Sequence, residues 1–255
     1  AITKTTPLDY HCELGLLYDD THCIPYHDSI FHFQKRPYEN TNEFNIVFLV
    51  PTGIGAAVGG HSGDAAQAAR LMAQCCDNLI LHPNVVNASD INELSENALY
   101  VEGSVIARLM MGNIGLQKSR CNQILILLDK HEDPFFTEAA INSVHAARAA
   151  LGIDCAGIVC MNNSIQMKTN FTSSGSAAGQ INYLERVCEV LNNNRSEYDA
   201  VALSSIIDVP KNYHLDYFQQ DMINPWGGVE AMLTHSISSL FNVPSAHSPM
   251  MSSRE

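Results

Sequence analysis

The central part of the chain decides the fold class. Residues 123–160 read QILILLDKHEDPFFTEAAINSVHAARAALGIDCAGIVC. The short, continuously apolar run at 123–128 is typical of a strand that is buried on both faces. A helix is expected over 134–151, and Gly152 is suited to end it because glycine adopts a left-handed backbone without strain. A second apolar run at 156–160 completes a predicted strand–helix–strand unit.

The same alternation continues on either side of this unit. Strands are expected at 45–50, 78–81, 98–101 and 200–204, helices at 64–76, 104–111, 180–191 and 228–241, and a final edge strand within 243–251. Parallel strands need crossover helices that cover the sheet, so this order predicts an α/β fold with a mostly parallel sheet and helices on both faces, in a Rossmann-like three-layer arrangement. Residues 1–44 are irregular and are interpreted as an N-terminal extension to a single α/β domain, 45–255.

Charge and cysteine content exclude several classes of function. The chain of 255 residues has 14 Lys+Arg against 27 Asp+Glu, a formal net charge of -13. Such a surface repels phosphate backbones and anionic lipid, so neither nucleic acid nor a membrane is expected as a partner. The eight cysteines lie mostly in apolar segments and no charged-then-apolar leader opens the chain. These features predict a cytoplasmic protein with reduced thiols.

A glycine-rich stretch follows the first strand of the predicted domain. Residues 51–64 read PTGIGAAVGGHSGD, and glycines there let the backbone approach a ligand closely. With the helix that follows, their N–H groups could hold a carboxylate or phosphate, although a tight turn between strand and helix would need the same glycines. The stretch matches neither the Walker A nor the GxGxxG pattern, so no organic cofactor is expected. The candidate substrate-binding residues are Thr52, Gly53, Gly55, Gly59, Gly60, His61 and Ser62.

Titratable side chains follow the next two strands. Pro83 holds His82 in an extended conformation, which suits it either to acid/base catalysis or to bracing the loop. Glu102 borders an apolar stretch, where burial would raise its pKa and suit it to proton transfer, but it could equally cap the following helix. The further candidates are Asp64 as a proton carrier and Asn84 and Asn87 as anion ligands.

Two more groups lie in the C-terminal half. Glu230 stands in the first turn of a helix behind Gly227 and Gly228, which makes a second candidate anion loop or a simple complement to the helix dipole. Cys160 ends a predicted strand and is either a nucleophile or part of the core, and Asn162 follows it in the loop as a candidate substrate ligand. The remaining candidate substrate-binding residue is His247.

Two other readings find less support. A strand-end Cys followed by Asn also occurs in the aspartate/glutamate racemase superfamily, but the stretch at 200–205 has Ser where the second catalytic Cys would stand. The N-terminal histidines match no metal-binding spacing, and no metal site is predicted. These histidines are His11, His22, His27 and His32.

Five motifs in order resemble an uncharacterised bacterial family that is frequent in cyanobacteria. They are PTGIGAAVGGHSGDA (51–65), LHPNVVNASD (81–90), NALYVEG (97–103), GGVEA (227–231) and VPSAHSP (243–249). The resemblance covers about residues 45–250. It implies that these loops belong to one catalytic site, and it brings no assigned reaction.

Together these features predict a cofactor-independent enzyme, either an isomerase, a lyase or a hydrolase. Its substrate is expected to be a small polar metabolite that carries a carboxylate. The glycine-rich stretch would hold this anion while His and Glu side chains move protons. The alternative is a non-catalytic nucleotide- or metabolite-binding module that uses the same stretch. A homo-oligomer is expected, with the N-terminal extension packing on the domain or on a second subunit.

Overall fold

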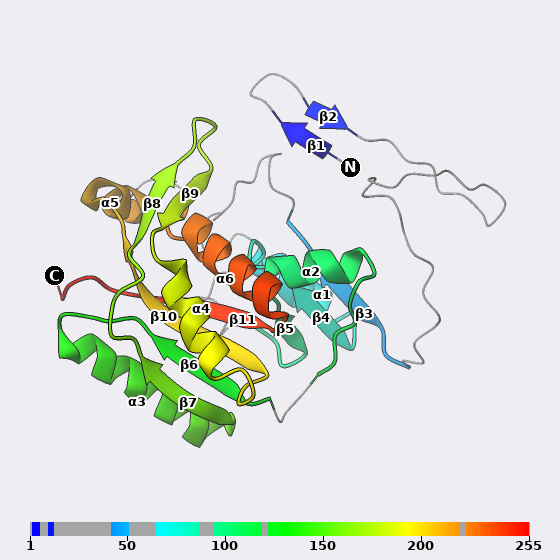
Figure 1. Ribbon diagram of the computed structural model, residues 1–255. Helices are drawn as coiled ribbons and strands as arrows, with labels where there is room; N and C mark the ends of the chain where they lie inside the picture. Colours follow the sequence, from blue (N-terminus) through cyan, green and yellow to red (C-terminus); the bar gives the residue numbers. More distant parts are fainter. Residues whose placement is uncertain are drawn as a thin grey trace.

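The fold is described from a computed structural model (Figure 1). It describes residues 2–5, 10–12, 42–50, 65–86, 94–118, 122–219 and 223–254. Within the first 44 residues, β1 (Ile2–Thr5) and β2 (Tyr10–Cys12) pair antiparallel.

The larger sheet has six strands in the order β7-β6-β10-β8-β9, with β11 paired to β10 beside this path. All pairings are parallel except that of β8 with β9. Helix α3 lies on one face of this sheet and α4 and α6 lie on the other, as Figure 1 shows. The elements are β6 (Ile124–Leu128), α3 (Pro134–Leu151), β7 (Cys155–Cys160), β8 (Met167–Phe171), β9 (Ala177–Ile181), α4 (Leu184–Asn193), β10 (Ala200–Asp208), α5 (Lys211–Gln219), α6 (Gly227–Phe241) and β11 (Ser245–Met250).

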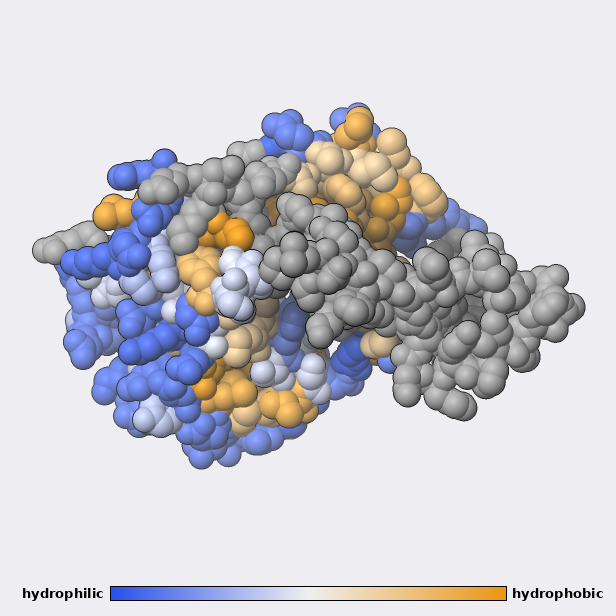
Figure 2. All heavy atoms as spheres, turned by 90° about the horizontal axis from the view of Figure 1, so that it is seen from above, coloured by the Kyte–Doolittle hydropathy of each residue, from blue (hydrophilic) through white to orange (hydrophobic). Residues whose placement is uncertain are grey.

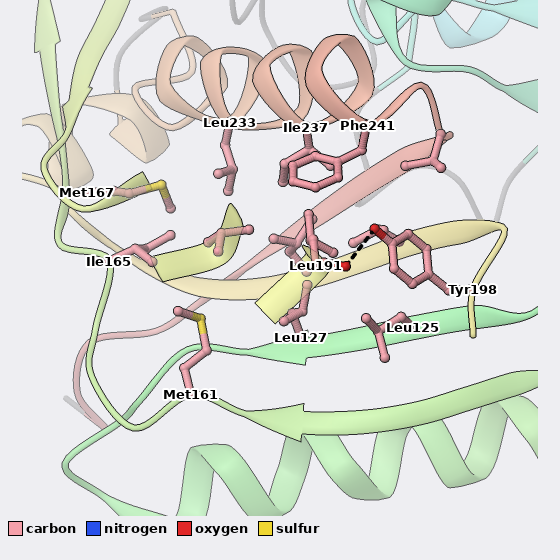
Figure 3. Close-up of a cluster of buried hydrophobic side chains, with 14 of the residues drawn as sticks. Leu125, Leu127, Met161, Ile165, Met167, Leu191, Tyr198, Leu233, Ile237 and Phe241 are labelled. Carbon is pink, nitrogen blue, oxygen red and sulfur yellow. Dashed lines mark hydrogen bonds between the residues drawn. The ribbon is translucent and has the colours of Figure 1, made fainter. Parts of the chain in front are cut away.

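The main core fills the space between this sheet and helices α4 and α6. Leu233 and Ile237 of α6 are fully buried and, as Figure 3 shows, lie over the strands together with Leu191 of α4. The phenol of Tyr198 donates a hydrogen bond of 3.2 Å to the carbonyl oxygen of Leu191. This core fixes α6 against β10 and β11, so the polar side chains of that helix have defined neighbours.

A smaller, all-parallel sheet of three strands has the order β3-β4-β5. It comprises β3 (Asn45–Phe48), β4 (Asn78–Leu81) and β5 (Ala98–Tyr100), with α1 (Ala66–Ala73) packed on β4 and α2 (Gly103–Met110) following β5. Helix α2 lies against α6, which connects the two sheets through their helices.

The predicted α/β class, with mostly parallel strands and helices on both faces, is confirmed. The strands from β3 to β11 form two sheets where the sequence suggested one. The polar stretches at 161–178 and 205–226 also hold structure that the apolar-run criterion missed, because β8 alternates buried and exposed residues and α5 has no strong apolar stripe. The space-filling view in Figure 2 shows a large group of hydrophobic side chains at the upper right of this face and smaller groups near its centre and lower edge. Exposed large apolar residues include Leu71 of α1, Met110 of α2 and Leu240 of α6.

Candidate functional site

Helix α2 begins at a buried carboxylate, Glu102. Its side chain accepts hydrogen bonds from the backbone N–H groups of Ser104 (3.0 Å) and Val105 (3.3 Å), and from the Ser104 hydroxyl. A carboxylate at this position satisfies N–H groups that have no partner within the helix. The capping role considered for Glu102 is therefore confirmed.

The same carboxylate holds a histidine from α6. His235 Nε2 lies 2.8 Å from Glu102 Oε1, and the side chains are 49% and 4% exposed, respectively. The hydrogen bond to Glu102 raises the pKa of His235 above its ordinary value. Burial pushes the pKa of Glu102 upward, but the hydrogen bonds from His235 and Ser104 outweigh it and bring this pKa below its ordinary value. The expectation of a raised pKa for Glu102 is therefore wrong.

This pair makes stability depend on pH. The pKa of His235 is higher in the folded chain than the ordinary 6.5, so its contribution is complete below about 6.5 and is lost as pH rises through the folded value. The pKa of Glu102 is lower than the ordinary 4.5, so its contribution is present above about 4.5 and is lost as pH falls through the folded value. We expect His235→Gln to lower the unfolding free energy by about 1 kcal/mol between pH 4.5 and pH 6.5, where both contributions are present. At higher pH the loss should be smaller.

Urea unfolding at a series of pH values measures this effect. The control is His145→Gln, the same substitution at an exposed position on α3, which should change the unfolding free energy by less than about 0.5 kcal/mol. Parallel profiles for the wild type and His235→Gln from pH 5 to 8 would contradict the pairing.

A second imidazole approaches the same point from β4. His82 Nδ1 accepts a hydrogen bond of 3.0 Å from the backbone N–H of Asn84, which leaves the proton of the neutral ring on Nε2. A Cβ at Gly103 would lie 2.8 Å from His82 Nε2 and 3.1 Å from His235 Nε2. Both rings therefore lie close to Gly103, and a Cβ at this position would require them to shift. Burial lowers the pKa of His82 below its ordinary value.

Tyr100, the last residue of β5, stands in the field of two carboxylates. Burial, Glu230 and Glu102 together raise the pKa of its phenol to about 12. The phenol therefore stays protonated at neutral pH and can donate a hydrogen bond. The pKa of Tyr100 responds to both carboxylates, so this phenol lies between the polar group around Glu102 and a second polar group around Glu230 of α6.

This second group joins α6 to the two strands beneath it. His247 Nδ1 lies 3.0 Å from Glu230 Oε1, and His247 Nε2 lies 2.7 Å from Ser205 Oγ. Ser205 shares the buried face of β10 with Leu203, whose register partner on β11 is His247. Farther along α6 the Ser245 hydroxyl donates to the Thr234 carbonyl oxygen (3.0 Å). The α6–β11 seam is thus polar along its length.

The structure brings some of the predicted residues together. His82 and Glu102 belong to the first group, and Glu230 and His247 bond to each other in the second. Asn84 contributes its backbone N–H to the first group. Outside the described residues lie Thr52, Gly53, Gly55, Gly59, Gly60, His61, Ser62, Asp64 and Asn87.

Other predicted residues are placed elsewhere. Cys160 is exposed on β7 and is three strands from β11 along the register through Leu128, Ser204 and Ser248, which corresponds to about 14 Å. Asn162 is exposed just beyond that strand. Gly227 and Gly228 open α6, and a Cβ at Gly228 would overlap the backbone at Ala177 in β9, so this glycine serves helix–strand packing.

Sequence reasoning missed His235, Ser205 and Tyr100. His235 follows Glu230 by five residues on one predicted helix, so the two face different neighbours and no local spacing relates them. Ser205 had a usable signal, because it continues the period-two alternation of a strand that was predicted over 200–204 and extends to Asp208.

In the part of the chain that the structure describes, no three His, Cys, Asp or Glu side chains are grouped closely enough to hold a metal ion. The side chains of the N-terminal histidines lie outside that part. The described site instead offers imidazole, carboxylate and phenol groups with opposed proton affinities, which is a composition suited to acid/base chemistry.

Comparison with known proteins gives one similar chain. It is an uncharacterized lipoprotein of Synechococcus sp., 36% identical over 209 residues, which are 80% of this chain and 58% of that protein. The chain thus spans a little more than half of this relative. No solved structure matches the chain described here.

This relative corrects one prediction. Its name calls it a lipoprotein, so the expectation of a cytoplasmic location is wrong. Among the described residues, no helix combines the length and the apolar character needed to cross a membrane.

The motifs of the sequence analysis find their counterpart in a family model. That model matches residues 45–255, which include both polar groups and the strands and helices that carry them. The resemblance to an uncharacterised bacterial family is therefore confirmed. The chain belongs to the family DUF3326, described as protein of unknown function.

Proposed function

We propose that the chain is an enzyme that moves protons on a small anionic substrate without an organic cofactor, as an isomerase, lyase or hydrolase. One observation carries the proposal. Two imidazoles with opposite pKa shifts, lowered for His82 and raised for His235, meet at Gly103 beside a buried carboxylate. Neighbouring titratable groups whose environments push their pKa values apart are typical of acid/base sites.

The geometry suggests a role for each ring. Glu102 accepts a hydrogen bond from Nε2–H of His235, and the other nitrogen of this half-exposed ring, Nδ1, would act on a substrate as general acid or base. His82 is neutral, and its Nε2–H would polarise a substrate oxygen as a hydrogen-bond donor. Glu102 itself is nearly buried and fully engaged, so it would orient His235 without touching the substrate.

Proton NMR of small carboxylates incubated with the full chain in D2O tests this proposal. An isomerase or lyase replaces C–H by C–D, and a lyase or hydrolase produces new signals, so one spectrum covers the three classes. The panel consists of hydroxy acids, amino acids and their simple esters and amides. At least one compound should change, and His235→Gln and His82→Gln should slow that change by about 10²-fold or more. His145→Gln should act at the wild-type rate.

The same panel of compounds distinguishes the proposed enzyme from the alternative, a module that binds a ligand without chemical change. If a compound raises the Tm of the chain but its NMR spectrum stays unchanged with wild-type protein, the site binds without turnover and the enzyme proposal fails. Equal rates for the wild type and His235→Gln would also remove the assigned roles.

A further inference from the structure

One edge of the larger sheet has no neighbour in the described part of the chain. Strand β7 forms this edge and pairs with β6 on its other side. The N–H of Met161, one residue past the strand, donates to the carbonyl oxygen of Leu128 (2.8 Å). Because successive residues of a strand direct their backbone groups to opposite sides, the N–H and C=O groups of Ala156, Ile158 and Cys160 point away from β6. Within the described residues these groups have no strand to pair with.

This edge lacks two features that commonly prevent pairing with another chain, a charged residue and a proline. The sequence of β7 is CAGIVC, and all six residues are at least partly exposed. Helix α3, which packs on β7, is equally uncovered, because none of its 18 residues is buried. A strand and a helix with this exposure are suited to burial against a further layer of protein.

The flank of α3 at this edge is self-complementary in charge. Half-buried residues such as Phe136 and Val144 mark the side of the helix that faces the sheet. Connections from a strand through a helix to a parallel strand are right-handed, which turns the flank with Glu138 and Arg148 away from β6 and toward the open edge. Both side chains are exposed, five residues before and five residues after Ser143 in the middle of the helix. A second α3, antiparallel about Ser143, would set each Glu138 beside an Arg148 of the other copy.

A twofold axis normal to the sheet provides this arrangement. It reverses the direction of strand and helix alike, so two β7 strands and two α3 helices would both lie antiparallel. The edge is about 20 Å long at β7 and about 27 Å at α3. With helices on both faces of the sheet (Figure 1), it is about 25 Å deep. Two copies would therefore bury on the order of 1,200 Å² in total, which reaches the lower limit of specific interfaces.

We propose that two copies of this chain associate through β7 and α3. The β7 strands pair antiparallel across a twofold axis, and Glu138 of each copy binds Arg148 of the other. This inference is independent of the proposed function, because β7 is three strands away from β11 and carries none of the polar groups of the candidate site. It assigns a surface to the homo-oligomer that is expected from the sequence.

Charge reversal tests the contact. Analytical ultracentrifugation of the full chain should give a dimer, with twice the 28.0 kDa of one chain. Glu138→Arg and Arg148→Glu should each raise the Kd of the dimer 10-fold or more, because symmetry places two like-charge contacts in the interface. The double variant has opposite charges again and should return the Kd to within about 3-fold of the wild type. The control Glu197→Arg reverses a charge at an exposed position between α4 and β10 and should leave the Kd unchanged.

The strand pairing has its own readout. Cys160→Lys adds a charge at the exposed end of β7, which a single chain tolerates and a paired edge does not. This variant should be monomeric with the far-UV circular dichroism of the wild type, and an intact dimer would overturn the strand pairing. A wild-type chain that is monomeric at about 100 µM overturns the whole proposal. So does a dimer that neither single reversal weakens or that the double variant fails to restore, because another surface would then hold it.

Discussion

Replacing Gly228 with alanine is expected to destabilise the chain by about 3 kcal/mol, which for a domain of this size lowers the Tm by roughly 6–12 °C. A Cβ at this position would overlap the carbonyl of Ala177 and lie 2.5 Å from the backbone nitrogen of Ala178. These are backbone atoms of β9, which cannot move aside as a flexible side chain would. The helix would have to lift from the β8–β9 hairpin, and the buried contacts of Val229 would go with it.

Gly157→Ala is the matched control. Gly157 lies inside β7, and its Cβ would meet only Leu125 Cδ1 at 3.9 Å, an ordinary contact. Thermal unfolding followed by circular dichroism should show a change below about 1 kcal/mol for this variant. A Gly228→Ala chain as stable as Gly157→Ala would mean that α6 does not pack on β9 as described.

Gly228 also shows which features a sequence can predict. The glycine pair before Glu230 was interpreted as a candidate anion loop, because its local pattern resembles one. Its packing partner, Ala177, is 51 residues earlier in the chain, in a stretch that was predicted to be loop. No local pattern reports such a contact. In contrast, the strand at Asn78–Leu81 and the helix at Pro134–Leu151 were predicted with their observed bounds, since apolar runs, a proline and a terminal glycine are local signals.

The candidate site divides in the same way. His82 and Glu102 were found because they directly follow strands, where parallel sheets place their ligands. His235 was missed because its role depends on α6 lying against α2, and its partner Glu102 is 133 residues earlier in the chain. Tertiary packing also reversed the expected pKa shift of Glu102: burial acts as predicted, but a partner from a distant helix outweighs it.

Asp129→Ala is expected to cost about 3 kcal/mol, through loss of hydrogen bonds at the end of β6. The Asp129 carboxylate is 2% exposed and accepts from the backbone N–H groups of Ile165 (3.1 Å) and Ile206 (3.4 Å). It also accepts from the Lys130 N–H (2.9 Å) and the Ser164 hydroxyl (3.1 Å). The Asp129 side chain thus hydrogen-bonds both the loop after β7 and strand β10 to the carboxyl end of β6. Alanine would leave buried donors without an acceptor.

The comparison with Asp129→Asn separates hydrogen bonding from charge. Burial raises the pKa of Asp129 despite the hydrogen bonds it accepts, so the folded chain binds this proton more tightly than the unfolded chain. Its ionisation therefore costs stability as pH rises above the ordinary value of 3.8. Asparagine keeps one acceptor oxygen and carries no buried charge, so at pH 7 it should be more stable than alanine in urea unfolding. Equal stability of the two variants would contradict the view that the Asp129 side chain stabilises the fold by accepting hydrogen bonds from these N–H groups.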